Sequence, residues 1–467
     1  MRISTLINQP VLLLGAGKEG LATLALLRSH GHQTEVLIVG DRIAEGLPEG
    51  TRIIASETLS QSLTAQTIVV RSPGFSPHHP LRKAIDRWGG VQTTATKIML
   101  AELNAAQINV MGITASKGKS TTSSLLTQML LESGQQTKLV GNIGIPALSQ
   151  LDEILRERPI VVMEMSSYQC DDLQAKEGPA CVVFGRLFPE HLDWHGDLKH
   201  YYAAKAKLLS AIPDGGHAYI DALALETLQS QGLVGTARRP EITLHPVNNG
   251  SGLRFSSGIF FDGNDALCSD EGMRIPGQHN RDNACLAYAA ARSHGAELEA
   301  FQNTLRQFSG LPFRLQYEGR IAGIDWINDS ISTAPEAACA ALEAFGKKGT
   351  ATLIVGGQDR GYDYSPLIEA ITQFQVPHVI LIPESGHTIG ILAENSVFKP
   401  LLAKIPSTFH AAESLSDAVQ LAAKLTPHGG RCVFSPAAPS YHHWSGFEAR
   451  GKDYRSCIEL LTELKPS

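Results

Sequence analysis

Short apolar runs rich in β-branched residues recur along the chain, and segments with a helical spacing of apolar residues lie between most of them. The runs contain few polar positions, as is typical of strands that are buried on both faces. They lie at 11–14, 35–39, 67–70, 108–112, 160–163, 181–184, 351–355, 378–382 and 432–434. Because strands that alternate with helices usually form parallel sheets covered by helices, the pattern predicts an α/β fold.

The length and the breaks in this pattern suggest three domains. The chain has 467 residues, which corresponds to about three domains of roughly 150 residues each. Breaks near Gln107 and near Pro312 predict domains at 1–106, 107–312 and 313–467, each of which contains a strand that runs into a glycine-rich turn. The stretch between about 210 and 275 is less regular and rich in turn residues, and it predicts a small antiparallel flap on the central domain.

Composition narrows the class of protein. Hydrophobic residues make up 43% and charged residues 18% of the chain, which are values of an ordinary globular protein. A net charge of -6 predicts no attraction to nucleic acid or to acidic lipid. The seven cysteines are scattered and form no CxxC pair, which argues against a zinc site or a disulfide framework. The N-terminal residues show neither a signal peptide nor a membrane span, so we expect a cytoplasmic protein.

The first glycine-rich turn matches the pattern GxGxxG. Gly15, Gly17 and Gly20 follow the strand at 11–14, and Asp41 lies about 20 residues further on, as in dinucleotide-binding folds. Amide groups at such a helix start attract phosphate whatever molecule carries it. The turn is therefore compatible with NAD(P), with another nucleotide-like ligand, or with a purely structural role.

The second turn carries a stronger signal. The segment 112–121 contains Gly-Lys-Ser at a strand-to-helix junction, where backbone amides surround phosphate groups, the lysine supplies a charge and the serine can hold Mg²⁺. The strict pattern GxxxxGK[ST] fails by one place, because Ile113 stands where the first glycine is expected and Gly112 comes one residue earlier. We still interpret this segment as a nucleotide-binding loop with Lys119 and Ser120 at its centre.

Three further residues carry candidate chemistry near this loop. Glu164 ends an apolar strand, where a carboxylate beside a phosphate loop commonly orients Mg²⁺. His191 lies in a short loop of acids and histidines, and Lys205 follows on a predicted helix. Taken alone, each of the three residues could equally be a solvated or structural side chain.

Eight motifs, taken in their order along the chain, resemble those of the Mur ligase family, and in particular its MurD type, which joins glutamate to UDP-N-acetylmuramoyl-L-alanine. The motifs are 112–121, Gly141-Asn142-Ile-Gly144, Glu164-Met-Ser-Ser167, His191-Leu-Asp193, Tyr202-Ala-Ala-Lys205, Gly277-Gln-His279-Asn280-Arg-Asp-Asn283, Gly310-Leu-Pro-Phe-Arg314 and Asn328-Asp329-Ser330. The resemblance runs from Gly15 to Gly451, and the family shares the one-residue shift in the phosphate loop.

The resemblance implies a fold and a reaction. It implies a Rossmann-like first domain that binds the UDP part of the acceptor, a central ATP-binding domain with a parallel sheet, and a Rossmann-like third domain that brings the amino acid. The implied reaction belongs to peptidoglycan precursor synthesis. ATP phosphorylates the acceptor's carboxylate, the amino group of glutamate attacks the acyl phosphate, and ADP and phosphate are released. We expect a monomer that uses Mg²⁺, with two ions in the site.

The resemblance also implies roles for individual residues. The implied ATP-binding residues are Gly112, Thr114, Gly118, Lys119, Ser120, Thr121, Asn280, Asn283, Arg314 and Asp329. The implied catalytic residues are Lys119, Glu164, His191 and Lys205, and the implied magnesium ligands are Ser120, Glu164, His191 and Lys205. The implied acceptor-binding residues are Gly15, Gly17, Lys18, Glu19, Gly20, Asp41, Ser72, Pro73, Gly74, Asn142 and Ser166. The implied glutamate-binding residues are Thr333, Arg360, Ser440, Tyr441 and Phe447.

Lys205 matches a lysine that is carbamylated in many relatives. Carbamylation would turn its ammonium group into an anionic carboxylate-like group that can hold a metal, and would remove its repulsion with Mg²⁺.

The chain departs from the usual pattern of this type around the amino-acid pocket. Ile331 stands where a lysine is usual, while Thr333 is retained, and Phe313 replaces a histidine. Loss of one charged contact could cost about 1.5–3 kcal/mol, which is enough to change the preferred isomer of glutamate. These changes are similar to a divergent branch that adds L-glutamate, so we favour L-glutamate over D-glutamate.

Three other functions compete with the ligase. The GxGxxG turn alone would suit an NAD-binding oxidoreductase, which leaves the phosphate loop unexplained. A non-catalytic nucleotide sensor would bind ligands without releasing phosphate. Folate-polyglutamate ligases share the phosphate loop, but they lack the N-terminal domain that begins with the GxGxxG turn.

Overall fold

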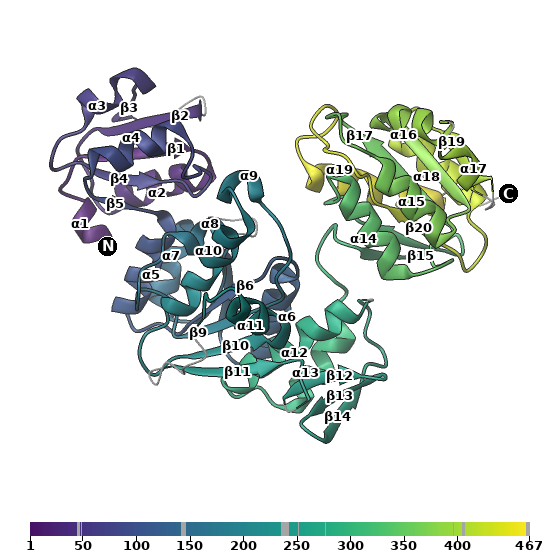
Figure 1. Ribbon diagram of the computed structural model, residues 1–467, viewed down its shortest axis with the longest axis horizontal. Coiled ribbons are helices and arrows are strands. Elements are labelled where there is room, and N and C mark those ends of the chain that lie inside the picture. The colour runs from purple at the N-terminus through teal and green to yellow at the C-terminus, as the bar shows by residue number, and fades with distance from the viewer. Residues whose placement is uncertain are drawn as a thin grey trace. The chain divides into compact units, whose positions relative to one another are not determined.

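A computed structural model describes residues 1–43, 47, 49–141, 146–234, 242–250, 252–275, 277–395, 397–403 and 407–463, without the side chains of residues 41–43, 193, 462 and 463. The chain divides into two compact units, of which one comprises Met1–Glu271 with His279–Leu305 and the other Gly272–Gln278 with Arg306–Ser467. Parallel sheets with helices on their faces form each unit (Figure 1). The predicted α/β fold is confirmed. The first unit holds two separate parallel sheets, and the division of the chain into three domains stays a prediction.

The first sheet has the strand order β3-β2-β1-β4-β5, and all its neighbouring strands are parallel. Its strands are β1 (Val11–Ala16), β2 (Val36–Ile43), β3 (Thr51–Ile53), β4 (Ile68–Arg71) and β5 (Gln92–Thr93). The helices of this part are α1 (Ile3–Leu6), α2 (Lys18–Ser29), η1 (Ser56–Thr58), α3 (Leu59–Ser62), α4 (Pro80–Trp88) and α5 (Ala95–Ala105). Leu13 packs in a core with Leu24 of α2, whereas Leu12 lies in a separate core with Leu81 of α4. Since neighbouring residues of a strand face opposite sides, the run at 11–14 is apolar throughout.

The second sheet has the order β11-β10-β9-β6-β8-β7 and is also parallel. Its strands are β6 (Val110–Thr114), β7 (Thr137–Gly141), β8 (Ile160–Glu164), β9 (Cys181–Phe184), β10 (His217–Asp221) and β11 (Thr243–Val247). The helices of this part are α6 (Lys119–Glu132), η2 (Ala147–Gln150), α7 (Leu151–Glu157), α8 (Ser167–Asp171), α9 (Leu192–His195), α10 (Leu198–Ser210), α11 (Ala222–Ser230), α12 (Gln278–Arg292) and α13 (Leu298–Gln307). β6 lies in the middle of the sheet, so the loop that follows it opens at the centre of the sheet's carboxyl edge.

The predicted antiparallel flap is confirmed for only part of its range. The three strands β12 (Leu253–Ser256), β13 (Ile259–Asp262) and β14 (Asp265–Ser269) form an antiparallel sheet. The earlier part of the range was predicted wrongly, because β10, α11 and β11 extend the central parallel sheet. β11 is an edge strand with mostly unburied side chains and contains Pro246, so it lacks the apolar run that marks a buried strand.

The second unit contains one sheet with the order β15-β16-β20-β17-β18-β19, parallel except for the pair β15 and β16. Its strands are β15 (Gln316–Ile321), β16 (Ile324–Asn328), β17 (Thr352–Gly357), β18 (His378–Glu384), β19 (Thr408–Ala411) and β20 (Arg431–Phe434). Its helices are α14 (Pro335–Phe345), α15 (Ser365–Phe374), α16 (Ser385–Ala393), α17 (Lys399–Leu402), α18 (Leu415–Leu425) and α19 (Phe447–Glu463). Residues of α14, α15 and α16 form the core on one face, while α18 and α19 cover the other.

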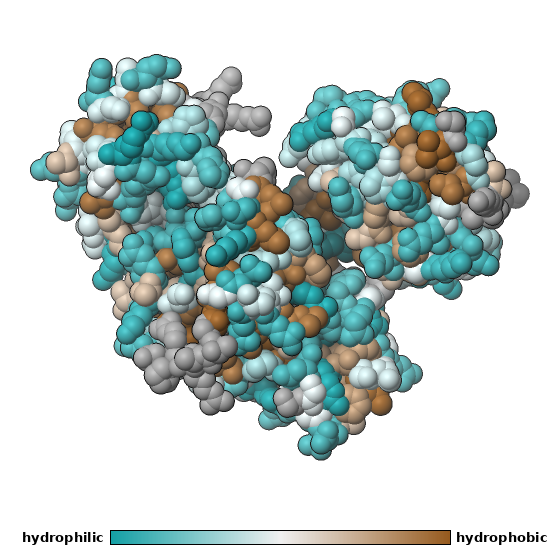
Figure 2. Space-filling model, viewed as in Figure 1, coloured by the Kyte–Doolittle hydropathy of each residue, from teal (hydrophilic) through white to brown (hydrophobic). Residues whose placement is uncertain are grey.

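The surface agrees with the composition. Hydrophilic residues cover most of the visible face of each unit, and apolar side chains gather over α16 and α17 of the second unit, where Ile391, Val397 and Leu401 are exposed (Figure 2). Each of the seven cysteines is a free thiol, as expected from their spacing. No helix in the described part of the chain has the length and apolarity that a membrane crossing requires.

Candidate active site

The predicted phosphate loop joins β6 to α6. Gly118 stands directly before α6 with φ +86, in the left-handed region, and a Cβ at this position would lie 2.5 Å from Oδ1 of Asn283. Only glycine combines this conformation with so close an approach. The packing brings Asn283 of α12, which was predicted to contact ATP, against the loop, and Asn280 of the same helix is also buried. Gly112 lies inside β6, where a Cβ would meet the ring of Pro179 at 2.5 Å.

Lys119 begins α6, and its side chain turns back over the loop. Its Nζ donates to the carbonyl oxygens of Ala115 at 3.1 Å and Ser116 at 3.0 Å. Phosphate oxygens could replace these carbonyl contacts at little cost, because a lysine ammonium group has three rotatable donors. Ser120 and Thr121 follow in the first turn of the helix, where the helix dipole also favours an anion.

Lys205 of α10 reaches the same loop from the other side. Its side chain is buried, and its Nζ donates to the carbonyl oxygen of Ala115 at 2.7 Å and to Oγ1 of Thr114 at 3.3 Å. Burial, followed by the charge of Lys119, lowers the pKa of Lys205 to about 7. A large fraction of Lys205 is therefore a neutral amine near neutral pH, which is the form that can react with carbon dioxide.

Tyr201 and Ser116 support this part of the loop, although neither was predicted as a site residue. The Tyr201 hydroxyl donates to Oγ of Ser116 at 2.8 Å, and the Lys205 ammonium lies 5.2 Å from the centre of the Tyr201 ring. Ser116 in turn donates to the carbonyl oxygen of Phe188 at 3.0 Å. These contacts hold the loop that follows β6 against α10. Tyr201 lies one turn before Lys205 on the same helix, and that spacing was the only available signal.

Glu164 and His191 lie in different surroundings. Glu164 ends β8, is buried, and is the strand partner of Ile113 in β6, directly before the loop. His191 is exposed, with φ +56, and its Nε2 lies 3.8 Å from Oε2 of Glu190. Glu190 is also paired with Lys117 of the loop. The structure therefore brings Glu164 to the base of the loop and His191 to its outer rim.

The side chains near the loop can be compared with the ligands that Mg²⁺ usually takes. Within the described ranges, no group of three or more His, Cys, Asp and Glu residues could hold a metal ion. Mg²⁺ usually takes one or two carboxylates together with substrate phosphates and water. The buried carboxylate of Glu164 and the hydroxyl of Ser120 supply oxygen donors of this kind, so the residues fit an ion that a nucleotide brings with it.

The predicted acceptor residues gather at the carboxyl ends of β1 and β4. Gly15 has φ +102, and a Cβ there would lie 2.9 Å from Oγ of Ser72. Gly20 packs on the carbonyl oxygen of Gly15. Gly17 precedes α2, and a Cβ there would meet no atom within 4 Å, so the start of α2 at Lys18 is open to a ligand. A Cβ at Gly74, which follows Pro73, would likewise meet no atom within 4 Å.

Glu19 and Ser166 meet through a residue that sequence reasoning missed. Gln169 donates to Oε1 of Glu19 at 3.3 Å, and it also closes a capping box with Ser166 at the start of α8. Burial raises the pKa of Glu19. The side chain of Asp41 and the whole of Asn142 lie outside the described residues.

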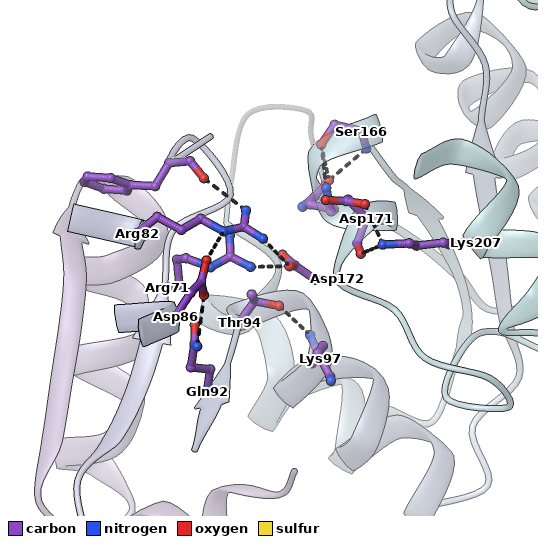
Figure 3. Close-up of polar contacts among 12 residues, drawn as sticks. Arg71, Arg82, Asp86, Gln92, Thr94, Lys97, Ser166, Asp171, Asp172 and Lys207 are labelled. Atoms are coloured by element: carbon purple, nitrogen blue, oxygen red, sulfur yellow. Dashed lines mark hydrogen bonds and ion pairs between the residues drawn. The ribbon is translucent and has the colours of Figure 1, made fainter. Parts of the chain in front are cut away.

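A buried ion cluster joins the first sheet to the second and was also not predicted. Arg71, at the end of β4, and Arg82, in α4, point toward the carboxylate of Asp172, which directly follows α8 (Figure 3). The side chains of Arg71 and Asp172 are less than a tenth exposed. Burial raises the pKa of Asp172 and lowers that of Arg82. Nε and Nη1 of Arg71 have no hydrogen-bond partner, so Arg71 depends on the carboxylate of Asp172. Arg82 also pairs with Asp86 at 3.7 Å and donates to the carbonyl oxygen of Phe75 at 3.2 Å.

We expect Asp172→Ala to destabilise the first unit by about 3–5 kcal/mol, because removing one partner leaves buried charge uncompensated. Chemical denaturation of the full chain measures this. Asp214→Ala is the matched control, since the pair of Asp214 with Lys176 is more than half exposed on both sides and should contribute less than ~1 kcal/mol. Equal effects of the two variants would contradict the structural role of the cluster.

In the second unit, the predicted site residue Asp329 is buried. It follows β16, accepts from Oγ of Ser435 at 2.7 Å and from the Leu315 amide at 3.1 Å, and burial raises its pKa to about 7. Arg314 closes a tight turn, in which its amide donates to the carbonyl oxygen of Leu311 at 3.1 Å, and it contributes a nearby positive charge. These two predicted nucleotide-binding residues therefore belong to one local cluster.

The predicted glutamate-binding residues are spread over three loops and the start of α19 in the second unit. Arg360 lies in the loop after β17, with its guanidinium 5.6 Å from the centre of the exposed Tyr441 ring. Ser440 is buried beside Tyr441, and the ring of Phe447 meets that of Phe313 edge-on at 6.4 Å. Thr333 is half-buried before α14. Arg360, Ser440 and Tyr441 are thus brought together.

Three comparisons with known proteins bear on this geometry. A family model described as the Mur ligase middle domain matches residues 113–291. The chain is 34% identical, over 97% of its length and 96% of the relative's, to the UDP-N-acetylmuramoyl-L-alanine--L-glutamate ligase of Xanthomonas axonopodis pv. citri. It is 32% identical, over 98% of its length and 99% of the relative's, to the ligase of the same name from Salinispora tropica. Among solved structures, UDP-N-acetylmuramate-alanine ligase from Thermotoga maritima matches with a TM-score of 0.58 at 14% identity, over 98% of this chain and 100% of that one.

Proposed function

Since this chain belongs to the Mur ligase family, we propose that it is an ATP-dependent ligase that joins glutamate, as the L isomer, to UDP-N-acetylmuramoyl-L-alanine. The observation that supports this most directly is the phosphate loop, in which Lys119 and the buried Lys205 both donate to the carbonyl oxygen of Ala115. The relatives that cover nearly the whole chain carry the name of this activity. The relatives named above are ligases, not NAD-dependent oxidoreductases.

We assign one task to each predicted domain. Residues 1–106 bind the UDP end of the acceptor at the open start of α2, where amide groups and the helix dipole favour the diphosphate. Residues 107–312 bind ATP at the loop between β6 and α6. Residues 313–467 bring glutamate, whose carboxylate pairs with Arg360. The acceptor, ATP and glutamate are small molecules that meet in the cytoplasm, and we expect the chain to act as a monomer.

In this proposal the first step transfers the γ-phosphate of ATP to the carboxylate of the acceptor's alanine. Both reactants are anions, so the ammonium of Lys119 offsets their repulsion while the loop amides hold the phosphates. Ser120 and Glu164 would hold Mg²⁺, with His191 at the rim, and the ion would supply positive charge to the transferring group. Carbamylated Lys205 would add an anionic group beside the loop without repelling the ion.

The second step forms the amide bond. The amino group of glutamate attacks the acyl phosphate, and the C–O bond to phosphate breaks. Arg360, Ser440, Tyr441, Thr333 and Phe447 position glutamate for this attack, which lowers the entropic part of the barrier.

We expect phosphate release to require the acceptor, ATP, Mg²⁺ and glutamate together, and to be at least about tenfold faster with L-glutamate than with D-glutamate, a difference of ~1.4 kcal/mol. The physical reason is the loss of a cation at Ile331, since the isomers differ in where the α-carboxylate points. A coupled phosphate assay with each isomer measures the ratio. Turnover with D-glutamate alone would contradict the isomer assignment, and phosphate release with neither would contradict the ligase itself.

A further inference from the structure

The loops that follow β17 and β20 lie where the chain topology of the second unit's sheet reverses. These strands are neighbours and parallel, yet the helices that follow them pack on opposite faces of the sheet. Residues of α15 lie in one core with Leu353, whereas residues of α19 lie in the other with Ile354. In open parallel sheets, such a reversal creates the crevice in which ligands bind. Arg360 lies in the loop that follows β17, and Tyr441 lies in the loop that follows β20.

A network of hydrogen bonds connects these two loops with the end of β18, and most of its members are not among the predicted glutamate-binding residues. Nε of Arg360 donates to Oε1 of Gln358 at 3.2 Å, and Nε2 of Gln358 lies 2.9 Å from Nε2 of His442. Nδ1 of His442 lies 2.8 and 2.9 Å from the two carboxylate oxygens of Glu384, which ends β18. Nε2 of His443 lies 3.2 Å from the same carboxylate.

This hydrogen-bond network determines the tautomer of His442. An arginine can only donate, so the oxygen of the Gln358 amide faces Arg360 and its nitrogen faces His442. An amide nitrogen also only donates, so Nε2 of His442 is the acceptor and carries a lone pair. The proton of the neutral imidazole is then on Nδ1, where it is donated to Glu384. This is the arrangement of a general base that is held by a carboxylate.

Two further observations indicate that this group can serve a ligand. The side chains of His442 and His443 are about half exposed, and that of Glu384 is 29% exposed, so a small molecule can reach them. Glu384 also has φ +66 and ψ -101 directly before α16, a conformation that is unfavourable for a residue with a Cβ. Strain of this kind persists where the surroundings enforce it, often at functional sites.

We propose that His442, oriented by Glu384, removes a proton from the ammonium group of the incoming glutamate. This inference rests on the proposed function. Glutamate enters with a positive ammonium group, which has no lone pair for attack, and its carboxylate binds Arg360 on the same hydrogen-bonded chain. Nε2 of His442 exchanges the Gln358 amide for the ammonium group and accepts one proton from it. The resulting imidazolium remains paired with the ionised carboxylate of Glu384.

The remaining atoms balance without another reactant. The nitrogen lone pair freed by the proton transfer forms the C–N bond to the acyl carbon. The electron pair of the breaking C–O bond leaves with phosphate, which takes up the second proton lost by the nitrogen. Gln358 and Glu384 are positioning residues in this scheme, because they act through His442.

The test compares two nucleophiles in the full-length protein with His442→Gln. Hydroxylamine is uncharged at neutral pH and attacks an acyl phosphate without first losing a proton, so hydroxamate formation measures acyl phosphate without the base. Glutamate ligation requires the base. We expect His442→Gln to form hydroxamate at the wild-type rate and to lose glutamate ligation by about 10²–10⁴-fold. Glu384→Gln should also form hydroxamate at the wild-type rate and should lose glutamate ligation by a smaller factor.

His387→Gln is the matched control, because His387 is an exposed histidine in the first turn of α16, close to Glu384 in the sequence, and both rates should persist. Wild-type glutamate ligation by His442→Gln would overturn the inference, and so would a proportional loss of hydroxamate and amide. If the wild-type protein forms no hydroxamate from acceptor, ATP and Mg²⁺, the proposed ligase function itself fails and the inference fails with it.

Discussion

Lys119→Ala is expected to abolish ATP-dependent phosphate release, with a loss of at least about 10²–10³-fold. The ammonium group of Lys119 lies over the phosphate loop, on the carbonyl oxygens of Ala115 and Ser116. In the proposed reaction two anions must approach each other, so loss of the one cation that begins α6 acts mainly on the transition state. The side chain is not part of the apolar core, so the variant should keep its fold. Steady-state phosphate release and thermal denaturation measure the two effects.

Lys117→Ala is the matched control in the same loop. Lys117 is 71% exposed and pairs with Glu190, and an exposed pair contributes less than ~1 kcal/mol. Its removal should therefore change turnover by no more than about fivefold. Equal losses in both variants would mean that the net charge of the loop, and not the position of Lys119, governs the reaction. A Lys119→Ala variant that retains a tenth of the wild-type rate would contradict the assignment of this loop to ATP.

Features with a short-range signal could be predicted from the sequence. Residues 112–121 are contiguous, and their glycine, lysine and serine types follow from what a phosphate requires, so the loop was found at the junction of β6 and α6. The buried strands were found because both of their faces are apolar. β11 was missed because it is an edge strand with exposed, polar positions and no apolar run. β10 is buried at four of its five positions, but the polar residues His217 and Asp221 at its ends leave an apolar run of only three residues.

Long-range polar contacts could not be predicted. Arg71 and Asp172 are 101 residues apart, and neither belongs to a local pattern, so only the folded chain shows that they share a buried contact. The same is true of Gln358 and His442, which are 84 residues apart. Arg360 was predicted because its position matches a basic residue of the family it resembles, whereas Glu384 ends an ordinary strand and becomes notable only through its partners and its backbone conformation.

Lys205→Ala is expected to lower turnover by about 10²–10³-fold, the scale of losing one placed electrostatic group, and short-chain carboxylic acids should restore part of it by replacing the carbamate. The pH dependence follows from the pKa of about 7. Carbon dioxide reacts with the neutral amine, which forms the carbamate and releases a proton. The neutral form falls from roughly 90% at pH 8 to roughly 10% at pH 6. The wild-type protein should therefore lose activity as the pH falls through 7, because the ammonium form does not react with carbon dioxide, and added bicarbonate should raise activity more at pH 8 than at pH 6.

Lys207→Ala separates this effect from a general change in α10. Lys207 lies two residues further along the helix and pairs with Asp171 at 2.6 Å, so its substitution should leave both turnover and the response to bicarbonate unchanged. Rescue of Lys205→Ala by acetate, without rescue by an amine such as ethylamine, would identify the missing group as an anion. Rescue by ethylamine without rescue by acetate would show that Lys205 acts as an ammonium group that donates to the Ala115 carbonyl. The two rescue agents separate these roles because an ammonium group and a carbamate carry opposite charges.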